Sequence, residues 1–209
     1  MRIVSLDPGA TDILVALGLG DALVGVDSES RRLLDTSAIP ILTPRDGHPA
    51  RLESEALVAL APDIVFAGAD AGGGPIARAT VRRVVARLER RPSVYALGPR
   101  TVGDVLSSVK TVGDAIGVPA RARELLVALT TSIDRVTLRT AGVAELPRVA
   151  CLVGRYPART AGFWVPELVG MAGGYAVIGG VGQPARPTSW DEVAACQPDV
   201  LVMLEPVGK

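Results

Sequence analysis

One short pattern occurs twice in this chain, and it constrains the fold more than any other feature of the sequence. Residues 55–66 read EALVALAPDIVF and residues 191–202 read DEVAACQPDVLV, with an acidic residue seven positions before the proline in both. Proline lacks the amide proton that would continue a helix, so each copy predicts a short helix, a turn at Pro62 or Pro198, and a buried strand. More than a hundred residues separate the copies, which is too long for a solenoid and suits one unit in each of two similar lobes.

Length and composition allow one α/β domain or two small lobes. The chain has 209 residues, and 48% of them are hydrophobic, enough to cover a sheet on both faces and to exclude disorder. The formal net charge is +0 and the only lysines are Lys110 and Lys209, so no basic surface for nucleic acid is expected. A strand is predicted directly after Met1, and no apolar run could cross a membrane. As given, the sequence predicts a cytoplasmic protein, or an extracytoplasmic one if a leader has been removed.

The first hundred residues predict strands that alternate with helices. Strands are expected over residues 3–6, 23–26, 39–42, 64–66 and 93–97, with helices between most of them. Continuous runs of branched apolar residues in this alternation are typical of a parallel sheet covered on both faces. After the first strand, a turn leads into a helix that Thr11 or a neighbour is expected to cap. This turn is a candidate ligand wall, formed by Pro8, Gly9, Ala10 and Thr11.

From Thr101 the apolar residues recur at helical spacing as far as about Arg139, passing through Gly117-Val118-Pro119. The pattern predicts nearly forty residues of helix, a stiff strut that disfavours large hinge closure. The expected organisation is an N-terminal α/β lobe over 1–100, a connecting long helix over 101–141, and a C-terminal α/β lobe over 142–209. In this last lobe, strands are expected over 148–153, 177–178 and 200–204, and helices start at Trp164 and after Ser189.

Side chains suited to catalysis are scarce, and no catalytic or metal-binding residue is predicted. His48 is the only histidine and lies in a loop with glycine and proline, and no nucleophile elbow is present. The single histidine also argues against a zinc or manganese site built from several imidazoles. Cys151 and Cys196 have the apolar neighbours of buried thiols, and a disulfide between them stays open. The loop Gly68–Gly74 resembles a phosphate-binding turn only weakly, because its glycine spacing differs and no Gly-Lys-Ser/Thr follows.

Aromatic residues make up only 3% of the chain, yet Tyr156, Phe163 and Trp164 flank one loop behind the predicted strand 148–153. Ligands of open α/β sheets bind beyond the carboxyl ends of the strands, so these rings could either face a ligand or pack in the core or its rim. Trp190 follows the cap of another helix, where packing and contact with a partner are both open.

Glu55 and Asp191 hold equivalent places at the two helix starts of the repeat. An acid there stabilises the first turn against the helix dipole, which is a sufficient reason for both of them. Arg155 and Arg159, in the loop after strand 148–153, could face an anionic ligand or solvent.

Several segments, in this order, resemble the substrate-binding proteins of ABC importers for cobalamin and iron-siderophores, and most closely the cobalamin-binding members. They are RIVSLDPGATDILVALGLGDALVGVD, LVALAPDIVFAG, the long helical stretch, GFWVPELVGMAGG and SWDEVAACQPDVLVML. The resemblance implies an α/β fold with two Rossmann-like lobes that have parallel sheets and are bridged by a long rigid helix, as in class III periplasmic binding proteins. Relatives continue past the position of Leu204, so the resemblance also implies a shortened second lobe.

The resemblance further implies a protein that is not an enzyme, needs no cofactor and binds a cobalamin-like corrinoid in the cleft between its lobes. Ligand contacts are expected from Pro8, Gly9, Ala10, Thr11, Gly68, Tyr156, Phe163 and Trp164. Glu55 and Asp191 match the acids, one on each lobe, that dock into arginine pockets of the membrane permease. The expected partners are the small ligand and the permease subunits, with the protein itself a monomer.

Three alternatives remain beside this interpretation. A siderophore-binding or haem-binding protein of the same fold would favour cationic residues such as Arg155 and Arg159. An α/β enzyme would bind a nucleotide or sugar phosphate at the Gly68–Gly74 loop. A partner-binding module would keep the two acids and bind no small molecule.

Overall fold

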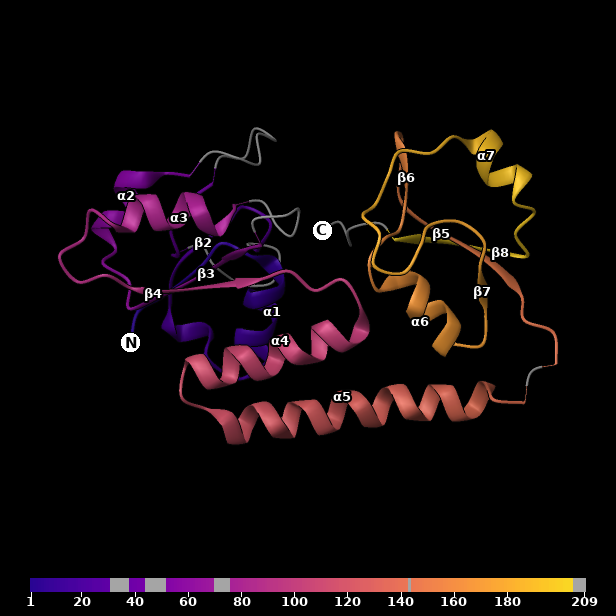
Figure 1. The fold of residues 1–209 in the computed structure, drawn as a ribbon, viewed down its shortest axis with the longest axis horizontal. Helices are drawn as coiled ribbons and strands as arrows, with labels where there is room; N and C mark the ends of the chain where they lie inside the picture. Colours follow the sequence, from indigo (N-terminus) through magenta and orange to yellow (C-terminus); the bar gives the residue numbers. More distant parts are fainter. Residues whose placement is uncertain (31–37, 44–51, 70–75, 143, 205–209) are drawn as a thin grey trace. The chain divides into compact units, whose positions relative to one another are not determined.

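The computed structural model describes residues 1–30, 38–43, 52–69, 76–142 and 144–204, and Figure 1 shows its helices and strands. The chain divides into two compact units, each with its own sheet. Unit 1 comprises Met1–Gly98 and Ser108–Leu125, and unit 2 comprises Pro99–Ser107 and Leu126–Lys209. Within the described ranges, none of the helices combines the length and apolar character that a membrane span needs.

Unit 1 contains a parallel sheet with the strand order β2-β1-β3-β4, as the alternating pattern predicts. Its strands are β1 (Ile3–Ser5), β2 (Leu23–Val26), β3 (Ile64–Gly68) and β4 (Ser93–Leu97). All of β1 and β3 is buried, because helices cover both faces of the sheet. In Figure 1, α2 (Ser54–Ala59) and α3 (Arg78–Val85) lie on one face, and α1 (Pro8–Ala16) lies on the other. A short 3₁₀ helix, η1 (Gly20–Ala22), leads into β2.

The strand expected over 39–42 is reduced to a single parallel bridge between Ile41 and Val26. Leu42 nevertheless joins the core cluster that includes Val4, Val65 and, from α2, Leu57. Side chains from alternate positions of neighbouring strands therefore meet the apolar stripe of the helix above them.

Residues 101–141 form two helices, so the single long helix predicted there is corrected. They are α4 (Val102–Ala115) and α5 (Pro119–Thr140). Between them Gly117 has φ +76, a left-handed conformation that glycine adopts without strain, and Pro119 begins the second helix. A Cβ atom on Gly113 would overlap that of Ala122, so this glycine lets the two helices approach closely. α5 alone has 22 residues, or about 33 Å of helix at the usual rise.

Unit 2 is built around β5 (Arg148–Arg155), which is longer than the predicted strand. The parallel strand β8 (Val200–Leu204) pairs with one edge of β5. The other edge of β5 is shared by β7 (Tyr175–Ala176), which is parallel, and β6 (Ala158–Thr160), which is antiparallel. The predicted α/β fold with two lobes is confirmed, and β6 is an addition that the sequence pattern did not indicate.

The helices α6 and α7 of unit 2 each pack on the sheet. Val165 of α6 (Val165–Met171) packs against a cluster that contains Cys151. Val193 of α7 (Trp190–Ala195) packs against Ala150 and Leu152, which alternate with Cys151 along β5. The pair β5 and β8 therefore lies between the helices, and Ser189 caps α7 as predicted.

Both cysteines are free thiols, so no disulfide joins them. Cys151 is buried, and this burial raises the pKa of its thiol. Cys196 is only partly buried, at the C-cap of α7. The predicted buried environment therefore holds for Cys151 alone.

The two copies of the repeat have the same local structure. α2 and α7 have six residues each, and Glu55 and Asp191 are the second residue of their helix. Each helix is followed by a residue in the left-handed region, Ala61 with φ 41 and Gln197 with φ 43. The proline, the aspartate and a strand come next in both copies, in the order that the sequence predicts. The strand of the first copy, β3, is buried, whereas β8 in the second copy is largely exposed, so the burial predicted for the second strand is wrong.

The aspartates of the two copies, Asp63 and Asp199, hold the turn to the neighbouring strand. Each accepts a hydrogen bond of 2.8 Å from the main-chain amide of an arginine, Arg2 and Arg148 respectively. The Arg2 guanidinium donates to the carbonyl oxygen of Leu60, at the end of its helix. The Arg148 guanidinium donates in the same way to the carbonyl oxygens of Cys196 and Gln197. Glu55 and Asp191 therefore occupy equivalent places in two equivalent pieces of structure.

Candidate functional site

The candidate ligand wall of unit 1 begins at Asp7, which caps α1. The Asp7 carboxylate accepts a hydrogen bond of 2.9 Å from the amide of Ala10, while Pro8 occupies the first turn. Of the capping residues expected in this turn, Thr11 or a neighbour, Thr11 is excluded because it lies inside α1 and is fully buried. Pro8 is half-buried and Gly9 is exposed, whereas Ala10 is buried. The surface of this turn is therefore presented by Pro8 and Gly9.

Thr11 belongs to a buried polar cluster at the carboxyl ends of β1 and β2. Its hydroxyl oxygen lies 2.8 Å from that of Ser5 and 2.8 Å from that of Ser30. Ser30 in turn donates to the Asp27 carboxylate, which also accepts from the amides of Glu29 and Ser30. The hydroxyl of Thr11 is therefore fully engaged in joining α1 to the two strands.

The same cluster perturbs Asp7. Burial is the main cause that raises the pKa of its carboxyl group from 3.8 to about 6, and the nearby charge of Asp27 acts in the same direction. The hydrogen bond from Ala10 lowers the pKa in part. The ionised carboxylate of Asp7 therefore destabilises the folded state, and the hydrogen bond that it accepts as the helix cap offsets this only in part.

Gly68 ends β3 and is buried, and its amide donates to the carbonyl oxygen of Ile76 at 2.9 Å. Residues 70–74 of the predicted Gly68–Gly74 loop and the histidine His48 lie outside the described residues. Groups of three or more side chains that could hold a metal ion are absent from the described part of the chain.

In unit 2, Phe163 and Trp164 form a stacked aromatic pair with ring centroids 6.0 Å apart. Both are half-buried, and Phe163 has φ 55, an unusual conformation for a bulky residue. The backbone around Phe163 holds this conformation, since its amide donates to Gln183 at 2.6 Å and its carbonyl oxygen accepts from Gly182 at 2.9 Å. The structure therefore fixes both rings at the start of α6.

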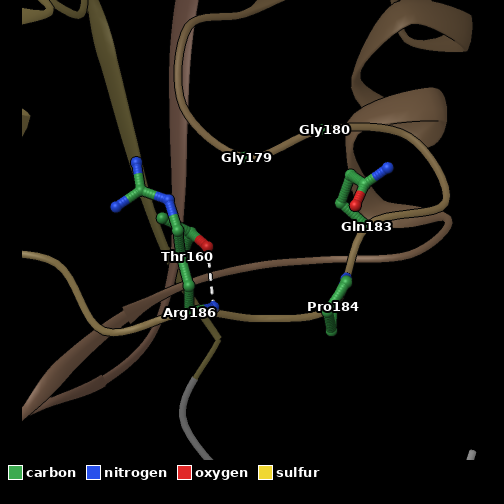
Figure 2. A pocket seen from close by; sticks show the side chains of 6 residues that line it. All are labelled: Thr160, Gly179, Gly180, Gln183, Pro184 and Arg186. Atoms are coloured by element: carbon green, nitrogen blue, oxygen red, sulfur yellow. Dashed lines mark hydrogen bonds between the residues drawn. The ribbon is translucent and has the colours of Figure 1, made fainter. Parts of the chain in front are cut away.

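Beside β6 lies a hollow of about 340 Å³, lined by Thr160, Gly179, Gly180, Gln183, Pro184 and Arg186. Figure 2 shows Thr160 and Arg186 on one side, Gln183 on the other, and the backbone of Gly179 and Gly180 along the rim. Gly179 has φ +82, and a Cβ there would lie 2.5 Å from the carbonyl oxygen of Ala161. A hydroxyl, an amide and a guanidinium around one hollow suit the acid or amide groups of a ligand. The sequence pattern does not predict this site, although the three glycines and two prolines over 179–187 indicate a shaped loop.

The guanidinium of Arg186 is already engaged by an acid of its own unit. It forms an ion pair with Glu192 through two nitrogens, and Thr188 donates to the same carboxylate at 2.7 Å. The hydrogen bond from Arg186 is the main cause that lowers the pKa of Glu192 to about 2. The negative charge of Glu192 is therefore paired with a cation of its own unit, and the same ion pair holds Arg186 in position at the hollow.

The two acids of the repeat have different surroundings. Glu55 is exposed and pairs with Arg87 of the segment after α3 at 2.9 Å. Asp191 is also exposed, but it forms no ion pair with another described residue. The two acids thus hold equivalent positions, but only Glu55 is paired with a cation of its own unit.

The remaining predicted residues of unit 2 also have defined places. Tyr156 is 83% exposed, and its ring centroid lies 6.5 Å from that of Trp190. Arg159 of β6 is exposed and donates to the carbonyl oxygen of Ala185 at 2.7 Å, while Arg155, also exposed, is the last residue of β5. The structure therefore pairs Tyr156 with the first residue of α7.

A family model described as "Periplasmic binding protein" matches residues 3–207 of the chain. Among curated proteins, none matches. Similar solved structures include the periplasmic haem-binding protein RhuT from Roseiflexus sp. RS-1, with 28% identity and a TM-score of 0.74 over 97% of this chain and 75% of that one. The periplasmic vitamin B12 binding protein BtuF of Vibrio cholerae has 23% identity and a TM-score of 0.74, again over 97% and 75%. The periplasmic haem-binding protein HutB of Vibrio cholerae has 22% identity and a TM-score of 0.76 over 97% and 76%.

Proposed function

Because this chain belongs to the periplasmic binding protein family of ABC importers, we propose that it binds a metal-tetrapyrrole and presents it to a membrane permease. The observation that carries the proposal is the family match from residue 3 to residue 207, together with a copy of the repeat in each unit. Substrate-binding proteins of this family need no cofactor, and the similar proteins BtuF and RhuT are named for the vitamin B12 and haem that they bind. The family is periplasmic, which favours the extracytoplasmic location of the two that the sequence left open.

Two ligands of this class have support of different kinds. A cobalamin-like corrinoid is favoured by the sequence segments that resemble cobalamin-binding proteins. Haem is favoured by the 28% identity with RhuT, which is named as a haem-binding protein. We keep the corrinoid as the first candidate and haem as the second, because both present a flat apolar macrocycle with acid or amide groups at its edge.

The proposed contacts follow from this shape. In unit 1 the exposed turn at Pro8 and Gly9 offers an apolar surface, with Ala10, Thr11 and Gly68 shaping the backbone behind it. In unit 2 the stacked rings of Phe163 and Trp164 suit an apolar macrocycle, since aromatic faces pack on flat π-systems. The hollow at Gln183 and Arg186 suits the polar groups of such a ligand.

Glu55 and Asp191 are the proposed docking acids for the permease. Their equivalent positions, second in α2 and second in α7, support this assignment. Reversing both charges is expected to abolish coupling to the permease and to leave ligand affinity unchanged. An equal loss of ligand binding would show that the acids serve the fold or the ligand site instead.

That the protein acts as a monomer and binds no nucleic acid stays a prediction.

A thermal-shift screen tests the ligand class directly. The panel comprises cyanocobalamin, haemin, a ferric hydroxamate siderophore, ATP and glucose 6-phosphate. The proposal predicts stabilisation by cyanocobalamin or haemin alone, because ligand that binds only the folded state raises its unfolding temperature. A shift with the siderophore alone would move the function to another cargo of the same fold. A shift with ATP or the sugar phosphate alone would favour the enzyme alternative and contradict the proposal.

A further inference from the structure

Positive charge is concentrated on α3 and the segment after it, although the formal net charge of the chain is +0. Residues 78–91 contain six arginines and a single acid. Val81 and Val85 of α3 face the core. The arginines between them therefore lie on the outer side of the helix. The α3 basic surface consists of the exposed arginines of this stretch, which are Arg82, Arg83, Arg87, Arg90 and Arg91.

Neighbouring acids balance only part of the α3 basic surface. Arg87 pairs with Glu55 of α2 at 2.9 Å, and this pair is exposed. Arg90 pairs with Asp63 at 3.3 Å, and its side chain is also exposed. The other three arginines form no ion pair with another described residue, and they are Arg82, Arg83 and Arg91. Their positive charge is therefore available to a partner.

The stability of α3 accounts for only part of this arginine cluster. Arg82 and Arg83 lie in the last turn of the helix, where the helix dipole favours a cation. α3 ends at Val85, and the effect of the dipole falls off within the last turn. Arg90 and Arg91 follow five and six residues later, so the dipole gives no reason for them. The number of arginines therefore exceeds what the helix requires.

The α3 basic surface has no large exposed apolar side chain beside its arginines. Within residues 78–91, Val81 and Val85 are buried, while Val84 and Leu88 pack partly buried against the same core. Specific protein interfaces have aromatic or aliphatic anchors at their centre, and this surface offers none. It is suited instead to an extended layer of negative charge, such as the headgroups of anionic phospholipids.

We propose that the α3 basic surface binds an anionic phospholipid membrane by charge, without inserting side chains into it. Glu55, the proposed docking acid of unit 1, lies beside this surface because it pairs with Arg87. Figure 1 shows their elements, α2 and the segment of α3, on the same face of the sheet. Membrane binding therefore turns this face of unit 1 towards the bilayer that holds a permease. That consequence rests on the proposed function, whereas the binding of lipid rests on the arginines alone.

The test is sedimentation of the full chain with vesicles made of equal parts phosphatidylglycerol and phosphatidylcholine. We expect binding to these anionic vesicles at low salt and none to vesicles of pure phosphatidylcholine. Binding to the anionic vesicles should be lost at about 0.5 M salt, because screening shortens the reach of exposed charges. This salt dependence distinguishes binding by charge from the insertion of apolar side chains.

Three variants identify the surface. A triple variant should bind the anionic vesicles about a hundredfold more weakly, roughly fivefold for each charge removed, and its substitutions are Arg82→Gln, Arg83→Gln and Arg91→Gln. A matched control removes three exposed arginines of α5 and should bind like the unaltered protein, and its substitutions are Arg123→Gln, Arg135→Gln and Arg139→Gln. Glu55→Gln frees Arg87 from its ion pair and should strengthen binding about fivefold.

Four results would overturn the inference. One is no sedimentation with anionic vesicles at low salt; binding of a DNA duplex or a polyglutamate peptide would then assign the surface to another polyanion. Another is equal binding to pure phosphatidylcholine. The third is undiminished binding by the triple variant, with circular dichroism showing that it is folded. The fourth is an equal loss of binding in the control. The assay needs neither tetrapyrrole nor permease, so its failure leaves the ligand proposal intact, and failure of the ligand screen leaves the vesicle test intact.

Discussion

The carboxyl group of Asp7 makes the stability of unit 1 fall as pH rises through the weakly acidic range. Asp7 is only 7% exposed, and its pKa is raised from 3.8 to about 6, chiefly by burial. Because the folded-state pKa lies above the unfolded one, folding favours the protonated form. The resulting stability is fully present below pH 3.8 and is lost as pH rises through about 6. The difference between these pKa values corresponds to about 3 kcal/mol of unfolding free energy.

Asp7→Asn separates the charge from the cap. The amide oxygen of asparagine can still accept the hydrogen bond from Ala10, and the buried charge is gone. We expect unit 1 of this variant to be more stable than the unaltered protein by up to about 3 kcal/mol at neutral and alkaline pH. The advantage should shrink towards zero as pH falls to 3.8, where Asp7 is protonated in both states.

Hydrogen exchange of amides in β1 and β3 is the appropriate assay, because both tryptophans of the chain lie in unit 2. Asp21→Asn is the matched control, since Asp21 is an exposed aspartate of the same unit, in η1, and its substitution should show a much smaller effect. A lower stability of Asp7→Asn at alkaline pH, or an advantage that does not change with pH, would refute the reasoning.

Four further substitutions test the packing of the two units. Ser189→Ala removes the acceptor of the Glu192 amide at 3.1 Å, so the unfolding free energy of unit 2, followed by tryptophan fluorescence, should fall by about 1 kcal/mol. Gly113→Leu forces a side chain into Ala122 and should lower the thermal unfolding temperature, whereas Gly170→Ala meets nothing within 4 Å and should add up to about 1 kcal/mol; equal effects would contradict the close approach of α4 and α5. Arg148→Ala removes the donors to the carbonyl oxygens of Cys196 and Gln197, so the free energy that protects the amides of β8 from hydrogen exchange should fall by about 1–3 kcal/mol. Unchanged exchange in β8 would show that this contact is dispensable.

The helix, the turn and the strand of the repeat could be predicted because each depends on residues within the repeat itself. Proline stops the helix, aspartate follows, and a run of branched residues marks a strand. Burial of the strand depends on what packs on it, since β3 is buried and β8 is largely exposed although both have such a run. The break between α4 and α5 was harder to predict, because the apolar period continues through Gly117 and Pro119 and only these two residues indicate a turn. The periodicity established helix without establishing how many helices there are.

The strand β6 could not be predicted from its composition. Ala158–Thr160 has three residues, and it becomes a strand by pairing with β5 and with the stretch around Pro187. The pairing of Tyr156 with Trp190 depends on that same register, and so it was invisible in the sequence. The sequence groups Tyr156 with Trp164 because the two are close in the chain, whereas long-range backbone pairing decides which rings meet.

The candidate site shows the same division between local and long-range information. A turn after β1 with proline and glycine is a local signal, but its cap is Asp7 and its threonine is buried by contacts to Ser5 and Ser30. The hollow near Gly179 depends on how its loop packs against Ala161, which no pattern in the loop reveals. The sequence therefore indicates which segments form the site, but not which of their side chains face a ligand.

The most direct test of the account is a calorimetric titration of the purified chain with cyanocobalamin and, separately, with haemin. The account predicts saturable binding of one of them, at one ligand per chain, and weaker binding when Trp164 is replaced by alanine. The Glu55→Arg and Asp191→Arg double variant should bind that ligand like the unaltered protein. The absence of binding heat with both compounds at high micromolar concentration, from a chain shown to be folded, would contradict the proposal that it carries a metal-tetrapyrrole.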